Sequence, residues 1–166
     1  MKELLDKLSS YNLFNYLLPG VLFAVITDAV TLTKLLQKDL LIGAFVYYFL
    51  GAVVSRIGSL VVEPILIRTR FIAVAPYADF VRASKEDPKL EVLSETNNMY
   101  RTLCALFLLV ALVAGYDFAS TFYPWLYEAA PAVCIVALFL LFLISYRKQT
   151  AYVVKRIQVH KPQAGP

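Results

Sequence analysis

Long apolar runs separated by short polar segments dominate this sequence. The four runs are Leu13–Val30, Leu40–Ile67, Thr102–Ala119 and Ala129–Tyr146. A helix needs about 20 mostly apolar residues to cross a bilayer, and each run is close to or above that length. The pattern predicts an all-α integral membrane protein with four transmembrane helices, which we place at residues 11–31, 40–67, 102–119 and 129–146. A charged share of 17%, below the roughly 25% of soluble domains, favours the same class.

A cleaved signal peptide is the alternative for the first run. Glu3 and Asp6 stand where such a peptide has a basic segment, and no Ala-x-Ala cleavage site follows. Pro19-Gly20 interrupts the run but leaves it longer than the apolar core of a typical signal peptide. We therefore predict a retained helix.

Basic residues outside the spans fall on one side of the predicted topology. The connection at 68–101 and the tail hold Arg68, Arg70, Arg82, Lys85, Lys89, Arg101, Arg147, Lys148, Lys155, Arg156 and Lys161. The first connection on the opposite side holds only Lys34 and Lys38, and the last, rich in aromatic residues, holds none. The positive-inside rule therefore predicts an N-in, C-in protein. Cys104 and Cys134 then lie at opposite leaflets, which excludes a disulfide between them.

Arg56 and Glu63 interrupt the second run, where charges are costly. Entry at Leu40 puts Arg56 about 24 Å and Glu63 about 35 Å along the helix, whereas the hydrocarbon core is about 30 Å thick. Glu63 then reaches the headgroup level, and Arg56 is within snorkelling distance of it. The spacing predicts two charges near the cytoplasmic border.

Polar positions of spans one and two predict a cluster at the inner leaflet. Arg56, Ser59 and Glu63 share one helix face, and span one brings two asparagines to the same level. The predicted cluster comprises Asn12, Asn15, Arg56, Ser59 and Glu63. Two interpretations stay open: the charges mark the border and hold spans one and two together, or they pair across subunits or line a water-filled vestibule.

The connection at 68–101 predicts a cytoplasmic helical hairpin. Tyr77, Phe80 and Ser84 have helical spacing, and Pro88 separates them from a second helix that runs into span three. Such a hairpin is too small for its own core, so it must lie against lipid, another copy or a soluble partner. Residues 1–10 predict an amphipathic turn at the interface or a frayed start of span one.

The tail at 147–166 is basic, which favours contact with anionic lipid. No recognised nucleic-acid-binding module is present, so nucleic acid is an unlikely partner. We expect partner or lipid contacts from Tyr77, Phe80, Arg82, Lys85, Arg147, Lys148, Lys155 and Arg156.

Catalytic chemistry has no support in the residues. Arg156-x-x-x-His160 is shorter than the signature of HEPN ribonucleases, and with one histidine no zinc site of the usual kind forms within one chain. We predict no cofactor and no metal. Asp28 and Asp117, near outer helix ends, are expected to be solvated.

Three stretches carry a family resemblance: "YNLFNYLLPGVLF", "SRIGSLVVEP" and "APYADFVRASKEDPKLEVLSETNNMYRT". With them, the chain resembles small four-pass inner-membrane proteins of bacterial phage-defence operons, such as the membrane subunit of the Kiwa system. The resemblance implies a non-enzymatic oligomer of the plasma membrane that signals to, or is held by, a cytosolic defence protein.

Two function hypotheses follow. The first is a homo-oligomeric membrane sensor that docks a cytosolic partner; the small residues Gly51, Ser55 and Ser59, spaced by four, favour close helix packing. The second is a triggered ion-conducting pore that depolarises the membrane, lined near its inner mouth by the face that carries Arg56 and Glu63.

Overall fold

The structure is a computed structural model that describes residues 13–160. The helices are η1 (Leu13–Leu17), α2 (Leu18–Val30), α3 (Leu40–Ile57), η2 (Gly58–Val62), α4 (Glu63–Arg68), α5 (Tyr77–Glu86), α6 (Lys89–Phe122) and α7 (Trp125–His160). This part of the chain contains no strand, which confirms the all-helical class. The amphipathic turn predicted for residues 1–10 lies outside the described residues.

Three helices are long and apolar enough to cross a membrane: Leu40–Arg68, Lys89–Phe122 and Trp125–Val159. The apolar helix Asn15–Val30 is shorter, about 24 Å against a core of roughly 30 Å. The structure thus supports three of the four predicted spans by length and composition.

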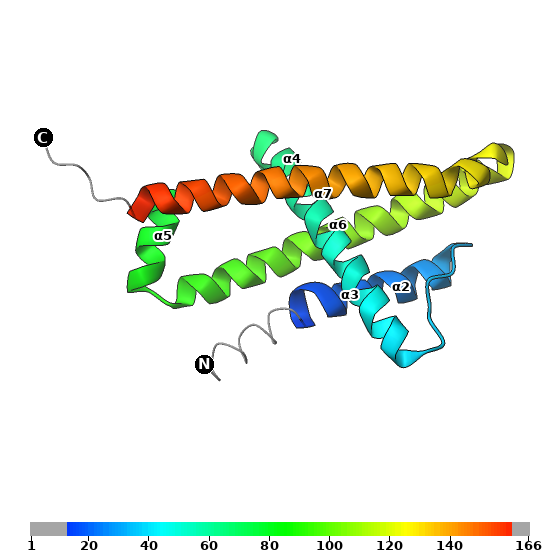
Figure 1. Ribbon diagram of the computed structural model, residues 1–166, viewed down its shortest axis with the longest axis horizontal. Helices are drawn as coiled ribbons and strands as arrows, with labels where there is room; N and C mark the ends of the chain where they lie inside the picture. The colour runs from blue at the N-terminus through cyan, green and yellow to red at the C-terminus, as the bar shows by residue number, and fades with distance from the viewer. Residues whose placement is uncertain (1–12, 161–166) are drawn as a thin grey trace, which may run out of the picture.

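Helices α6 and α7 are much longer than a bilayer crossing requires. Their 34 and 36 residues extend about 51 and 54 Å, so each has about 20 Å beyond a 30 Å core. They meet in a tight turn at Tyr123 and Pro124, and α5 bridges them near their other ends (Figure 1). We call these the turn end and the α5 end.

Local caps explain where the helices begin. The Asp39 side chain accepts a hydrogen bond of 2.8 Å from the backbone N–H of Ile42 and so caps α3. Pro76 and Pro88 precede α5 and α6, and Asp87 accepts from the N–H of Lys89 at 2.9 Å. The predicted break at Pro88 therefore separates two helices, and α6 continues without interruption from Lys89 into the third apolar run.

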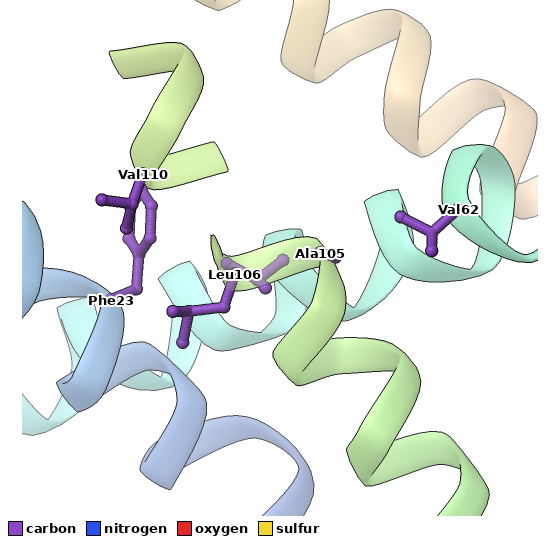
Figure 2. Packing of buried hydrophobic residues seen from close by; sticks show 6 residues of the cluster. Phe23, Val62, Ala105, Leu106 and Val110 are labelled. Atoms are coloured by element: carbon purple, nitrogen blue, oxygen red, sulfur yellow. The ribbon is translucent and has the colours of Figure 1, made fainter. Parts of the chain in front are cut away.

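The apolar core lies where α2, α3 and α6 meet. Its buried members are Phe23, Val54, Val62, Ala105, Leu106 and Val110. Figure 2 shows Phe23 of α2 beside Val110 of α6, with Leu106 and Ala105 about one turn earlier in α6. Leu106 and Ala105 of α6 are fully buried, as are Ala24 of α2 and Val54 of α3, so all three helices contribute to the centre of this core.

Helices α2 and α3 touch through their backbones. A Cβ atom on Gly20 would overlap the Tyr47 carbonyl oxygen, and one on Gly51 would overlap the Tyr16 carbonyl oxygen. Gly58 allows a less close approach of α6, since its Cβ would lie 3.1 Å from the Arg101 carbonyl oxygen. These glycines set the separation of the three core helices.

Helix α7 packs sparsely against the rest. Only 6% of its most apolar 18-residue stretch is buried, against 28% for α6. A ring contact of 6.0 Å joins Phe142 to Phe49 of α3, and another of 5.5 Å joins Tyr152 to Tyr77 of α5. Lys148 adds polar contacts to Ser59 and Glu63 near the α5 end, and Tyr116 donates to the Leu126 carbonyl oxygen at the turn end.

Candidate functional site

A cluster of charged side chains joins three helices at the α5 end. Glu63 Oε2 accepts from Arg101 Nη1 at 3.2 Å and from Lys148 Nζ at 3.3 Å. These side chains are 21–28% exposed, so water screens the two ion pairs only partly. One carboxylate of α4 thereby links to α6 and α7.

Lys148 also binds η2, the π-helical turn that precedes Glu63. Its Nζ donates at 2.7 Å to both the carbonyl oxygen and the hydroxyl of Ser59. With Glu63 the ammonium has three acceptors, which matches its three N–H groups. We call Ser59, Glu63, Arg101 and Lys148 the Glu63 cluster.

The structure brings together part of the polar cluster predicted from the sequence. Ser59 and Glu63 meet through Lys148, and Asn15 is buried on η1. Arg56 is half-buried and has no ion pair within residues 13–160; Asn12 lies outside that range. The counter-charges of Glu63 come from α6 and α7.

Sequence reasoning missed Arg101 as a partner and assigned Lys148 to lipid or protein contact. A signal was available: Glu63 lies four residues before the end of the second apolar run, Arg101 directly precedes the third, and Lys148 lies two residues after the fourth. A topology that puts these three run ends at one level also puts the three charges there.

The predicted packing residues have different surroundings. Gly51 lies at the backbone contact between α2 and α3, Ser55 is half-buried, and Ser59 binds Lys148. Gly20, which interrupts the first apolar run, is the partner of Gly51 across this contact.

A groove of about 800 Å³ opens beside the Glu63 cluster. Its walls come from α4, the connection at 69–76, α5, α6 and α7, and consist of Glu63, Pro64, Ile67, Arg68, Ala73, Val74, Ala75, Tyr77, Phe80, Leu90, Leu93, Ser94, Asn97, Lys148, Tyr152 and Lys155. Four of the predicted contact residues, Tyr77, Phe80, Lys148 and Lys155, therefore line one concave surface. The other four are exposed outside it: Arg82, Lys85, Arg147 and Arg156.

Tyr152 lies at the centre of the aromatic part of this groove. Lys148 and Lys155 each place Nζ 5.9 Å from its ring centroid, within the range of cation–π attraction. Burial raises the pKa of the Tyr152 phenol, and the negative charge of Glu63 raises it further. The phenol therefore stays protonated and available as a hydrogen-bond donor.

Asp117 corrects an expectation at the turn end. It is buried, and its carboxylate accepts from the backbone N–H of Leu32 at 2.6 Å and of Thr33 at 3.2 Å. Asp28 accepts from the N–H of Leu35 at 3.1 Å and lies 3.5 Å from the Lys34 ammonium. The prediction that Asp117 is solvated was wrong, because the connection after α2 folds over α6 and needs an acceptor for its backbone donors.

The described residues contain no group of three or more His, Cys, Asp or Glu side chains that could hold a metal ion. Cys104 and Cys134 are free and exposed. Comparison of the chain with protein-family models, curated proteins and solved structures gives no match. The resemblance to Kiwa-like membrane subunits therefore stays a prediction.

Proposed function

We propose that this chain is a non-enzymatic membrane protein that docks a cytosolic protein at its α5 end. In this proposal it crosses a bacterial inner membrane four times, with both termini and the α5 end in the cytoplasm. The observation that supports it most strongly is the length of α6 and α7, which carries a surface of fixed helices clear of the lipid.

The first segment of α6 exposes apolar side chains beyond the predicted headgroup layer, and one of them, Leu93, also lines the outer part of the groove. Val92 and Leu93 are 63% and 58% exposed, and they precede Thr102, where the third span is predicted to begin, by about 13–15 Å. The headgroup layer is only about 5–8 Å thick on each side. Exposed apolar groups in water favour a protein contact.

Basic side chains surround this end of the molecule. Arg82 and Lys85 are exposed on α5, and Arg147 is exposed on α7. Residues 147–160 contain no acidic residue. The partner that fits is a protein that presents an apolar side chain to Val92 and acidic groups to the basic residues, because complementary charge favours both encounter and orientation.

The Glu63 cluster gives such a platform a route for sensing the membrane. It ties η2 and α4, which continue α3, to α6 and α7 at the point where all leave the predicted spans. A change in how the spans pack would then shift the helices that carry Val92 and Arg82. The sparse packing of α7 leaves room for a second copy beside it, as a homo-oligomeric sensor requires.

A photo-crosslinking amino acid placed at Val92 in native cells tests the docking proposal. We expect a covalent adduct with a soluble protein, weakened about tenfold by Leu93→Asp, since loss of an apolar anchor costs about 1–2 kcal/mol. The same probe at Phe139, which is 65% exposed on the apolar part of α7, serves as the control and should give no soluble adduct.

Failure to form an adduct at Val92, or equal adducts at both positions, would contradict the proposal. Ion flux through purified protein in liposomes would favour the pore instead. Because Arg101 and Lys148 already neutralise Glu63 within one chain, we expect those liposomes to be silent.

A further inference from the structure

We infer that the groove at the α5 end binds the phosphate headgroup of an anionic phospholipid. The inference rests on the membrane placement proposed above but not on the cytosolic partner. Glu63 and Lys148, which both line the groove, lie within four residues of the ends of the second and fourth apolar runs. Tyr152 and Lys155 lie about 6 and 10 Å further along α7 than Lys148. The groove therefore occupies the headgroup layer, about 5–8 Å thick, and extends just beyond it.

The groove carries unbalanced positive charge. Glu63 is the one carboxylate among its lining residues, and two cations already pair with it. Arg68 and Lys155 also line the groove, and neither makes a hydrogen bond or ion pair with any residue between 13 and 160. About two positive charges remain for an anion, and basic pockets between membrane helices at this level are suited to lipid headgroups.

The uncharged donors suit the same ligand. The Tyr77 and Tyr152 rings lie 5.5 Å apart in the groove, and the Tyr152 hydroxyl retains its proton. Phosphate oxygens are strong acceptors for such groups and for guanidinium. Ile67, Val74 and Phe80 supply apolar wall for the glycerol and the first methylenes of the acyl chains.

The neighbouring connection also fits a lipid surface. Phe71 and Val74 are 79% and 59% exposed directly after α4, beside Arg68 and Arg70. Apolar side chains next to arginines at a predicted membrane border are typical of segments that lie in the interface. A headgroup in the groove would contact α4, α5 and α7 together and so make the α5 end responsive to lipid composition.

Lipid titration of the delipidated full chain in detergent, followed by native mass spectrometry, tests the inference. We expect phosphatidylglycerol to bind at least tenfold more tightly than phosphatidylcholine. The double variant Arg68→Gln/Lys155→Gln should weaken phosphatidylglycerol binding about 25-fold, or about fivefold per lost cation. The matched control Arg82→Gln/Lys85→Gln removes the same charge outside the groove and should change binding less than twofold.

Four results would overturn the inference. Equal binding of phosphatidylglycerol and phosphatidylcholine would show that the groove does not prefer an anionic lipid. Equal losses of phosphatidylglycerol binding in both double variants would show that the preference comes from diffuse surface charge and not from the groove. Displacement of the lipid by glycerol 3-phosphate at comparable concentration would assign the groove to a soluble phosphate. If Arg68→Gln/Lys155→Gln instead abolished the adduct at Val92 with lipid binding intact, the groove would belong to the protein partner. An intact adduct alongside lost lipid binding keeps the two proposals separate.

Discussion

Gly51 and Gly115 are glycines of the same chain in opposite surroundings. A methyl group on Gly51 would overlap the Tyr16 carbonyl oxygen, whereas one on Gly115 would meet no atom within 4 Å. Gly51→Ala should therefore push α2 away from α3. We expect it to lower the free energy of unfolding by about 2–4 kcal/mol, because the added methyl group can be accommodated only if the backbone moves. Gly115→Ala should raise stability by about 0.5–1 kcal/mol, because alanine is the better helix former.

Unfolding of both variants in mixed micelles measures the difference. A Gly51→Ala protein as stable as the Gly115→Ala protein would show that α2 and α3 do not touch at this point.

Arg70 is the single non-glycine residue with a positive φ, 59°, among residues 13–160. It follows α4, and the N–H of Phe71 returns to the Leu66 carbonyl at 2.9 Å, an arrangement in which glycine is usual. Arg70→Gly should therefore stabilise the protein by about 0.5–1 kcal/mol. Thr69→Gly, at an ordinary helical φ of −78°, should destabilise it by about 1 kcal/mol. Thermal unfolding of the two variants measures these changes. A loss of stability in both would contradict the positive φ assigned to Arg70.

At the scale of elements, two arginines near the same level should differ in importance. Arg101 pairs with Glu63 across helices, and Arg56 has no ion pair in the described part of the chain. Arg101→Met, which keeps an apolar stem, should cost about 1–3 kcal/mol because it removes a charged hydrogen bond. Arg56→Met should cost less than about 0.5 kcal/mol. Denaturant unfolding in micelles compares the stability of the two variants. A larger loss of stability for Arg56→Met than for Arg101→Met would indicate that Arg56 is the partner of Glu63.

Lys148 is expected to control how α7 lies against the other helices. Its ammonium contacts Ser59 and Glu63, while most of the apolar surface of α7 has no neighbour in the structure. Lys148→Met should therefore broaden the distribution of distances between spin labels on Cys104 and Cys134, which are both exposed. Arg147→Met, one residue away and exposed, should leave it unchanged. An unaltered distribution in Lys148→Met would mean that the aromatic contacts and the hydrogen bond from Tyr116 to Leu126 position α7 without Lys148.

The sequence predicts the elements better than their contacts, and the reason is the range of the interactions. Apolar runs and Pro88 act locally, so the three long helices and the continuity of α6 from Lys89 into its span follow from them. The Glu63–Lys148 pair joins residues 85 positions apart and depends on how three helices pack. Asp117 was misread for the same reason, because its partners at Leu32 and Thr33 come from a distant connection.

At the scale of the whole molecule, the number of crossings decides the position of the N-terminus. Helix α2 is shorter than a bilayer core, yet its backbone contact with α3 at Gly20 and Gly51 holds it beside a predicted span, so we still expect the first apolar run to cross. Four crossings put residue 2 on the same side as the α5 end, whereas three put it on the side of the turn end.

Single cysteines in a Cys104→Ser/Cys134→Ser background, probed with a membrane-impermeant maleimide on intact cells, measure this arrangement. We expect Phe122→Cys and Lys38→Cys to react from outside, and Lys2→Cys and Lys85→Cys to react only after lysis. If Lys2→Cys also reacted from outside while Lys85→Cys did not, the chain would cross the membrane three times and not four. External labelling of Lys85→Cys would place the α5 end outside the cell. That result would contradict both the docking of a cytosolic partner and the inner-leaflet position of the lipid groove, because each depends on that end facing the cytoplasm.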